Sequence, residues 1–272
     1  MRWGLASILG LGLACLACGA AEVEVDDDWG YADESAVETI PGRTPLPHRP
    51  GTPKSSLSFG SGGAPGPATC SNSGEGPSRS IGKASEGSLE NPCRIPTSGP
   101  GYLALSKDAW ATDETIALLQ QAARQVAEQF PGSGPVLVGG LSAEAGGFLP
   151  PHRSHQSGRD VDLGYFRTDQ PNARRFTLVG PDELDAEKTW ALIEALLYTG
   201  EVTFVFIDHG LQARLYEELV DQGWSEDSLQ QLFQYPEGPT VPRGLIRHSP
   251  GHDNHLHVRF RCAAKDRPDC VD

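Results

Sequence analysis

Apolar residues recur every three or four positions between Ile116 and Phe130, which is typical of a helix with one buried face. Thr112 precedes this stretch with a side chain suited to an N-cap, and two acidic residues follow it where the helix dipole is positive. Gly132 and Gly134 interrupt the pattern at its other end. The pattern therefore predicts a helix that begins after Thr112 and ends before Gly132.

Shorter periodic segments follow this helix. Residues 136–138 form an apolar run typical of a buried strand, and residues 202–207 predict another strand. Residues 190–197 predict a second helix, and leucines spaced four apart within 211–219 predict a third. We therefore expect one α+β domain at residues 78–272, with a small antiparallel sheet flanked by helices.

Polar and apolar residues alternate strictly in the segment 255–260. A strand with this pattern directs its apolar side chains into the core and leaves His255 and His257 on the opposite face. These side chains would lie about 6 to 7 Å apart along the strand, because each residue rises about 3.3 Å. A second alternating run places Asp160 and Asp162 on one face of another strand.

The first part of the chain differs in composition. Arg2, an apolar stretch and small residues resemble an export signal too short to span a membrane as a stable helix. The residues around Cys15 and Cys18 fit lipidation of a cysteine as well as plain secretion. We expect a signal peptide at 1–18 and a disordered Pro/Gly/Ser-rich linker at 19–77, which buries too little apolar surface to offset its ordering entropy. Such a linker serves either as a tether or as a dispensable tail.

Charge and cysteine content narrow the class of protein. The formal net charge of −14 argues against nucleic acid as a partner, because binding phosphates requires a basic surface. Export would place the cysteines of the domain in an oxidising compartment, which favours disulfides over metal ligation. Cys262 with Cys270 would close a short loop directly after the histidine strand. Cys70 with Cys93 is then the residual pair, although four cysteines allow three pairings.

Four of the eight histidines lie in two short runs, 154–162 and 252–257, together with several aspartates. Any one of these residues alone would more commonly be an ordinary polar residue, but their conjunction points to a metal site. Imidazole and carboxylate ligands suit zinc, which takes about four ligands and, in catalytic sites, keeps one position open for water. The chain has no His-Glu-x-x-His helix, which excludes the thermolysin arrangement. The residues alone therefore predict a metal-dependent amide hydrolase whose sheet carries the zinc site.

The motif His-x-x-Gly-x-x-x-Asp at 155–162, with a later His-x-His at 255–257, resembles a zinc-peptidase superfamily. This superfamily includes lysostaphin, D-Ala-D-Ala peptidases and Hedgehog domains. Within it, the runs 154–162 and 252–262 resemble the penicillin-insensitive murein endopeptidases. The resemblance covers most of residues 78–272 and none of the linker.

The resemblance implies that His155, Asp162 and His257 bind zinc, with water as the fourth ligand. It implies that His255 is the catalytic base, which takes the proton of the zinc-activated water and returns it to the leaving amine. An additional aspartate and histidine of the family have no evident counterpart before the second helix, so the resemblance does not extend to a second metal site.

The other two histidines implied by the resemblance are His252, which would position substrate or stabilise the oxyanion, and His152, which would bind substrate. The implied substrate is the D-alanyl to meso-diaminopimelyl cross-link of peptidoglycan. The implied location is the periplasm, with attachment to the outer membrane if an N-terminal cysteine is lipidated.

Two alternative functions fit the same residues. A D,D-carboxypeptidase would need a cation for the terminal carboxylate, which Arg153, Arg159 or Arg247 could supply. A non-catalytic, zinc-stabilised binding module would keep the metal but would not need His255 as a base beside it.

Overall fold

The computed structural model describes residues 66–72 and 74–272. The expected signal peptide at 1–18, its two cysteines and most of the expected linker at 19–77 lie outside the described residues. Within the described part of the chain, no helix is long and apolar enough to cross a membrane.

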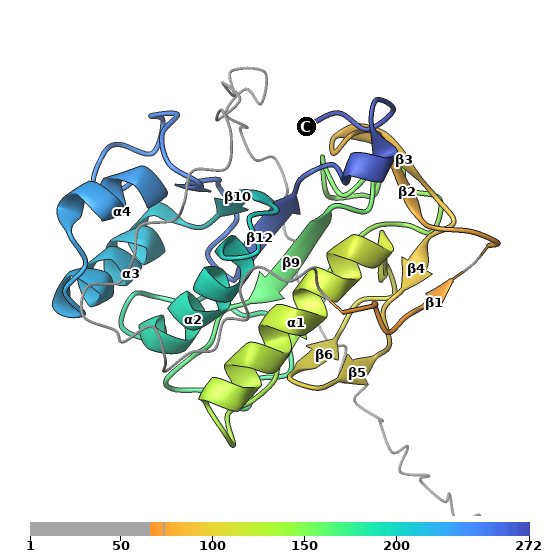
Figure 1. Cartoon of the computed structure of the whole chain (residues 1–272). Helices are drawn as coiled ribbons and strands as arrows, with labels where there is room; N and C mark the ends of the chain where they lie inside the picture. Colours follow the sequence, from red (N-terminus) through yellow and green to blue (C-terminus); the bar gives the residue numbers. More distant parts are fainter. Residues whose placement is uncertain (1–65, 73) are drawn as a thin grey trace, which may run out of the picture.

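A seven-stranded sheet forms the centre of the molecule, in the order β11-β10-β12-β9-β8-β6-β5 (Figure 1). The expected α+β class is confirmed, but the sheet is larger than expected and mixed, because the pairs β6–β8 and β10–β11 are parallel. Two of its strands contain only two residues, too few for an alternation pattern to be recognised. The strands are β5 (Ser98–Gly99), β6 (Tyr102–Ala104), β8 (Val136–Val138), β9 (Asp160–Gly164), β10 (Val202–Phe206), β11 (Ile246–Arg247) and β12 (His255–Phe260).

Helices α1 and α2 lie in front of the central strands in Figure 1, with α3 and α4 beside them. The cap predicted at Thr112 is confirmed, since its side chain accepts a hydrogen bond from the backbone of Thr115. The second helix begins before the predicted Trp190, because Asp185 caps it by accepting from the backbone of Lys188. The sequence pattern did not indicate α4. The helices are α1 (Asp113–Gln129), α2 (Ala186–Leu197), α3 (His209–Asp221), α4 (Glu226–Leu232) and the short 3₁₀ helix η2 (Ala264–Asp266).

The apolar faces of β9 and β12 belong to one buried core that also includes the apolar sides of α1 and α2. Leu256, Val258 and Phe260 are all buried in it, as the alternation predicts. Burying such side chains contributes roughly 1.5 to 3 kcal/mol each. This packing fixes which way the two strands face, and so directs their polar side chains to the other face of the sheet.

Two disulfides brace the domain at its ends, and both expected pairings, Cys70–Cys93 and Cys262–Cys270, are confirmed. The packed unit extends back before residue 78, because Thr69 exchanges two hydrogen bonds with the side chain of Gln120. Two small sheets complete this region: β1 (Ser71–Asn72), β4 (Cys93–Arg94) and β7 (Trp110–Ala111), and the hairpin of β2 (Arg79–Lys83) and β3 (Glu86–Glu90).

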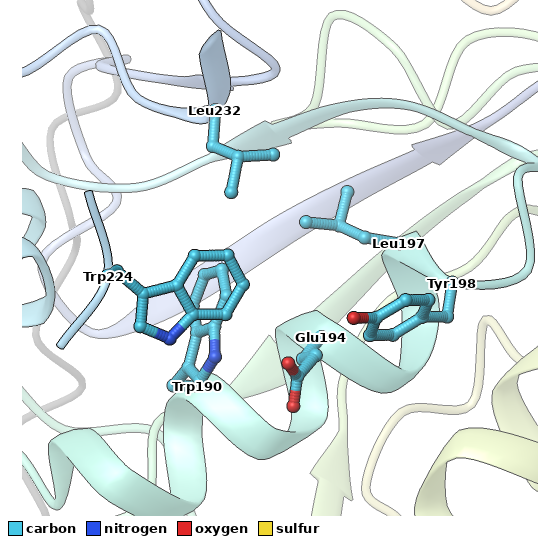
Figure 2. Close-up of a pocket in the computed structure, with 6 residues that line it drawn as sticks. All are labelled: Trp190, Glu194, Leu197, Tyr198, Trp224 and Leu232. Atoms are coloured by element: carbon cyan, nitrogen blue, oxygen red, sulfur yellow. The ribbon is translucent and has the colours of Figure 1, made fainter. Parts of the chain in front are cut away.

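A small pocket opens on the helical side, between α2 and the segment that contains α4 (Figure 2). The rings of Trp190 and Trp224 meet edge to face, and Leu197 and Leu232 complete an apolar lining. This pocket contains none of the expected site residues. The chemistry predicted from the sequence belongs to the opposite, polar face of the sheet.

Candidate metal centre and active site

The candidate site is built on the polar face of two antiparallel strands, β9 and β12. Their register places His257 directly opposite Asp162. Side chains opposite one another in an antiparallel pair lie about 4.5 to 5.5 Å apart at their Cβ atoms. Two residues 95 positions apart in sequence therefore become neighbours through strand pairing.

The three expected metal ligands converge on one point. His155 Nε2 lies 3.1 Å from His257 Nδ1, and Asp162 Oδ1 lies 3.2 Å from each of these nitrogens. Ligands about 2.0 to 2.2 Å from a tetrahedral zinc ion would lie roughly 3.3 to 3.6 Å from one another. All three side chains are buried. The donors are of the kind that binds zinc, and their spacing is only slightly shorter than that of a tetrahedral zinc site.

The surroundings of His155 and Asp162 direct one atom of each side chain toward the point of convergence. His155 Nδ1 lies 2.6 Å from the carbonyl oxygen of Leu141, so Nδ1 carries the proton and Nε2 keeps its lone pair. Asp162 Oδ1 is buried without a hydrogen-bond partner among the described residues. A buried carboxylate oxygen without a donor is costly, and a bound cation would satisfy it.

The buried carboxylates and histidines of the site shift one another's pKa values. Burial would raise the pKa of Asp162, but His155 and His255 hold it well below its usual range. Burial alone would lower the pKa of His257, but the carboxylates of Asp160 and Asp162 raise it to about 9. Without a metal, His257 is therefore protonated at neutral pH and partly replaces the positive charge of the ion.

His255 lies beside the three converging atoms, with its Nε2 3.6 Å from Asp162 Oδ1. Its Nδ1 donates to the side-chain oxygen of Asn254, which leaves the lone pair of Nε2 directed toward the site. Burial lowers the pKa of His255, so the ring is neutral at pH 7 and can accept a proton.

Phe176 stacks on the ring of His255, with centroids 5.5 Å apart and planes only 9° from parallel. Two glycines make room for the phenyl ring. A Cβ at Gly139 would lie 2.6 Å from it, and a Cβ at Gly164 would lie 3.0 Å from it. The position of His255 thus depends on a loop outside the two motifs.

His252 and His152 complete the cluster. The ring of His252 lies 4.9 Å from that of His255, and the ring of His152 lies 4.3 Å from that of His155. Burial and His255 lower the pKa of His252 to about 3, and burial and His155 lower the pKa of His152 to about 4. The structure thus brings all six expected site residues together.

A second triplet of possible ligands overlaps the first. His152, His155 and Asp162 each offer an atom within 4.8 Å of the others, so these three could also hold a metal. His152 Nδ1 is 3.8 Å from Asp162 Oδ2, a looser approach than that of His257 to Oδ1. His152 is also more exposed. The tighter spacing favours His257 as the third ligand.

The three arginines considered as anchors for a substrate carboxylate differ in burial and in their contacts. Arg159 is buried and donates to the carbonyl oxygens of Phe260 and Val271, so it holds the C-terminal segment in place. Arg247 donates to the carbonyl of Gly244 and lies over an aromatic ring on β10. Arg153, which follows His152, is exposed. Arg159 is therefore excluded as a substrate anchor.

A comparison with known protein families matches a part of the chain that includes several residues of this site. A model of the family described as penicillin-insensitive murein endopeptidase matches residues 80–222, which is more than half of the chain. The protein belongs to this family. The match includes His152, His155 and Asp162 and ends before β12, so the placement of His255 and His257 rests on the strand pairing.

Curated members of the penicillin-insensitive murein endopeptidase family are similar over most of their length. One from Klebsiella pneumoniae subsp. pneumoniae is 27% identical over 207 residues, covering 70% of this chain and 68% of the relative. One from Escherichia coli O1:K1 / APEC is 26% identical over 215 residues, covering 72% of this chain and 71% of the relative. Both bear the family's name.

Proposed function

We propose that this protein is a zinc-dependent murein endopeptidase that hydrolyses D-alanyl to meso-diaminopimelyl cross-links in peptidoglycan. The observation that carries the proposal is the convergence of His155 Nε2, Asp162 Oδ1 and His257 Nδ1 to within 3.2 Å of one another. Family membership and the names of the relatives support murein as the substrate, and the particular cross-link is part of the proposal.

His155, Asp162 and His257 would hold the zinc ion from the buried side of the site. When bound, zinc lowers the pKa of a coordinated water toward about 7 and polarises the carbonyl group that is attacked. The remaining histidines lie around these ligands, and His255 and His152 retain some exposure to solvent. The substrate would therefore approach from the side of His152, His252 and His255.

His255 would act as the general base. Its unprotonated Nε2 takes a proton from the attacking water and later returns it to the amine that leaves, so the base is regenerated in each cycle. A base positioned in this way contributes about 10²- to 10⁴-fold to the rate. No serine nucleophile takes part, which accounts for insensitivity to compounds that acylate a serine.

His252 would position substrate rather than stabilise an oxyanion. Its Nδ1 lies 3.1 and 3.0 Å from the carbonyl oxygens of Ser249 and Pro250, so Nδ1 carries the proton. In the neutral ring Nε2 is then an acceptor, suited to an N–H group of the substrate. His152, also neutral at pH 7, would contact the substrate beside His155, whose ring lies 4.3 Å from its own.

Peptidoglycan as substrate fits an exported protein, as the sequence of the first 18 residues predicts. We place the protein in the periplasm. Anchoring through a lipidated Cys15 or Cys18 stays a prediction from the sequence, which mass spectrometry of the mature N-terminus would test.

The decisive experiment is incubation of purified protein with cross-linked muropeptide dimers, followed by chromatography and mass spectrometry. An endopeptidase converts dimers to monomers, whereas a carboxypeptidase releases free D-alanine and leaves the cross-link intact. We expect cleavage to monomers that stops with a chelator and returns with added zinc. Zinc binding without any change in the dimers would favour a binding module and refute the proposal.

Zinc binding is expected to release about one proton per chain at pH 6. His257, with a pKa raised to about 9, holds its proton below that pH and must lose it before Nδ1 can bind the metal. At pH 6 a zinc-coordinated water, with a pKa near 7, would still be mostly protonated and would add little. Calorimetric titration of the protein with zinc, in buffers of different ionisation enthalpy, measures the number of protons released. A count near zero would contradict a protonated His257.

A further inference from the structure

One buried carboxylate, that of Asp160, contacts both proposed histidine ligands. Its Oδ2 accepts a hydrogen bond of 2.9 Å from the backbone N–H of His155. Its Oδ1 lies 3.3 Å from Nε2 of His257, on the side of the ring opposite the metal-facing Nδ1. Asp160 is only 1% exposed and lies outside the proposed ligand set.

We propose that Asp160, supported by Arg259, is the positioning residue of the metal site and sets the orientation of both histidine ligands. The inference rests on the proposed function, since it takes His155 and His257 as ligands. It goes further by assigning the affinity of the site to a residue that would touch neither the metal nor the substrate.

The contact with His257 selects the form of the ring that can bind a metal. A neutral imidazole that coordinates through Nδ1 must carry its proton on Nε2. A carboxylate beside Nε2 favours that tautomer and limits rotation of the ring, as outer carboxylates do for metal-bound histidines in general. Because Asp160 and His257 belong to paired strands, the arrangement would exist before the metal arrives.

The contact with His155 acts on the backbone. His155 has a φ of +64°, in the left-handed region that residues with a Cβ seldom adopt. The hydrogen bond from its N–H to Asp160 holds the chain in this conformation, which directs the imidazole toward Asp162. Gly158, also at positive φ, lets the chain turn back into β9.

Arg259 balances the buried charge of Asp160. The two residues are opposite one another in the register of β9 and β12. Arg259 Nε donates to Asp160 Oδ1 at 2.8 Å. Burying a carboxylate without a partner is strongly unfavourable, so the guanidinium lets Asp160 stay ionised beside the ligands. The polar face thus has two adjacent cross-strand pairs. The pair of Asp162 and His257 would bind the metal, and the pair of Asp160 and Arg259 would support those ligands.

The test is the zinc affinity of Asp160→Asn, measured by competition with a chromophoric chelator. Asparagine has nearly the same shape, but it loses the charge and one of the two acceptors. We expect the Kd for zinc to rise about 10- to 100-fold, the usual effect of losing an outer partner of a ligand. The visible spectrum of the cobalt-substituted protein should change as well, because the ligand geometry loosens. An unchanged Kd would overturn the inference.

Two further variants separate positioning from charge balance. Asp169→Asn removes a carboxylate paired with Arg167 outside the site and should leave the Kd unchanged. Arg259→Lys keeps the carboxylate and a counter-charge, so its Kd should rise far less than that of Asp160→Asn. Equal losses in Arg259→Lys and Asp160→Asn would show that zinc binding responds to any change in this buried pair and not to the carboxylate of Asp160 in particular, and would also overturn the inference.

A second variant, Asp160→Glu, tests the proposal if Asp160→Asn does not fold. Asp160→Glu keeps the charge and displaces the carboxylate by one methylene, so it should also weaken zinc binding, and wild-type affinity in it would reject the proposal. Failure of the proposed function looks different, because the wild-type protein itself would then bind no zinc or leave muropeptide dimers intact.

Discussion

Replacing His257 with alanine is expected to abolish both zinc binding and cleavage of muropeptide dimers. His257 would supply one of three protein ligands, and its Nδ1 lies within 3.2 Å of the other two ligand atoms. Losing a ligand should raise the Kd by more than the 10- to 100-fold typical of an outer partner. Metal content after dialysis and the rate of dimer cleavage measure the two effects.

The metal-free His257→Ala protein should also be less stable. In the wild type the charged ring lies beside two buried carboxylates, Asp160 and Asp162, and alanine leaves them with less positive charge nearby. Circular dichroism and thermal unfolding separate this loss from loss of the metal. His209→Ala is the matched control, because His209 lies at the start of α3 and contacts the carbonyl of Glu237. It should bind zinc normally.

One result would reassign the ligands. If His257→Ala still binds one zinc ion with wild-type affinity, the third ligand is His152, whose atoms also approach His155 and Asp162. The double variant His152→Ala/His257→Ala would then lose the metal. The two overlapping triplets thus make opposite predictions for a single substitution.

Alternation of polar and apolar residues is enough to predict which side chains share a face, but not which residues lie opposite one another. The sequence predicts that His255 and His257 share one face of their strand. It also predicts that Asp160 and Asp162 share one face of a different strand. Bringing them together depends on the register of β9 with β12, which is set by packing of the whole core. The motifs therefore indicate the site, while the fold determines its geometry.

The supporting residues could not be predicted for a related reason. Asp160 and Arg259 are 99 positions apart, and nothing local in the sequence links them. Phe176 lies in a segment without periodicity, and its contact with His255 depends on the space left by Gly139. Arg159 was a plausible anion anchor until the structure showed it buried against the C-terminal segment. Roles of this kind depend on long-range contacts, whereas local patterns record only which face is buried.

Replacing His255 with alanine is expected to separate metal binding from catalysis. His255 Nε2 is 3.6 Å from Asp162 Oδ1, farther than either proposed histidine ligand, and its lone pair is free to accept a proton. The variant should keep zinc with an affinity within a few-fold of wild type. Its kcat should fall about 10²- to 10⁴-fold, which corresponds to about 2.7 to 5.4 kcal/mol of transition-state stabilisation.

The same variant separates the two peptidase functions that the sequence left open from the non-catalytic binding module. A binding module would not need a base, so His255→Ala would leave its zinc and its affinity for peptidoglycan unchanged and would have no rate to lose. Either peptidase would lose its rate, and only the products formed by the wild type tell them apart. Loss of zinc in His255→Ala would mean that His255 is itself a ligand, and the base would have to be sought in His252 or His152. Because the lone pair of His255 Nε2 is free and lies 3.6 Å from Asp162 Oδ1, closer than the 3.8 Å between His152 Nδ1 and Asp162 Oδ2, retained metal with lost turnover is the outcome that the geometry supports.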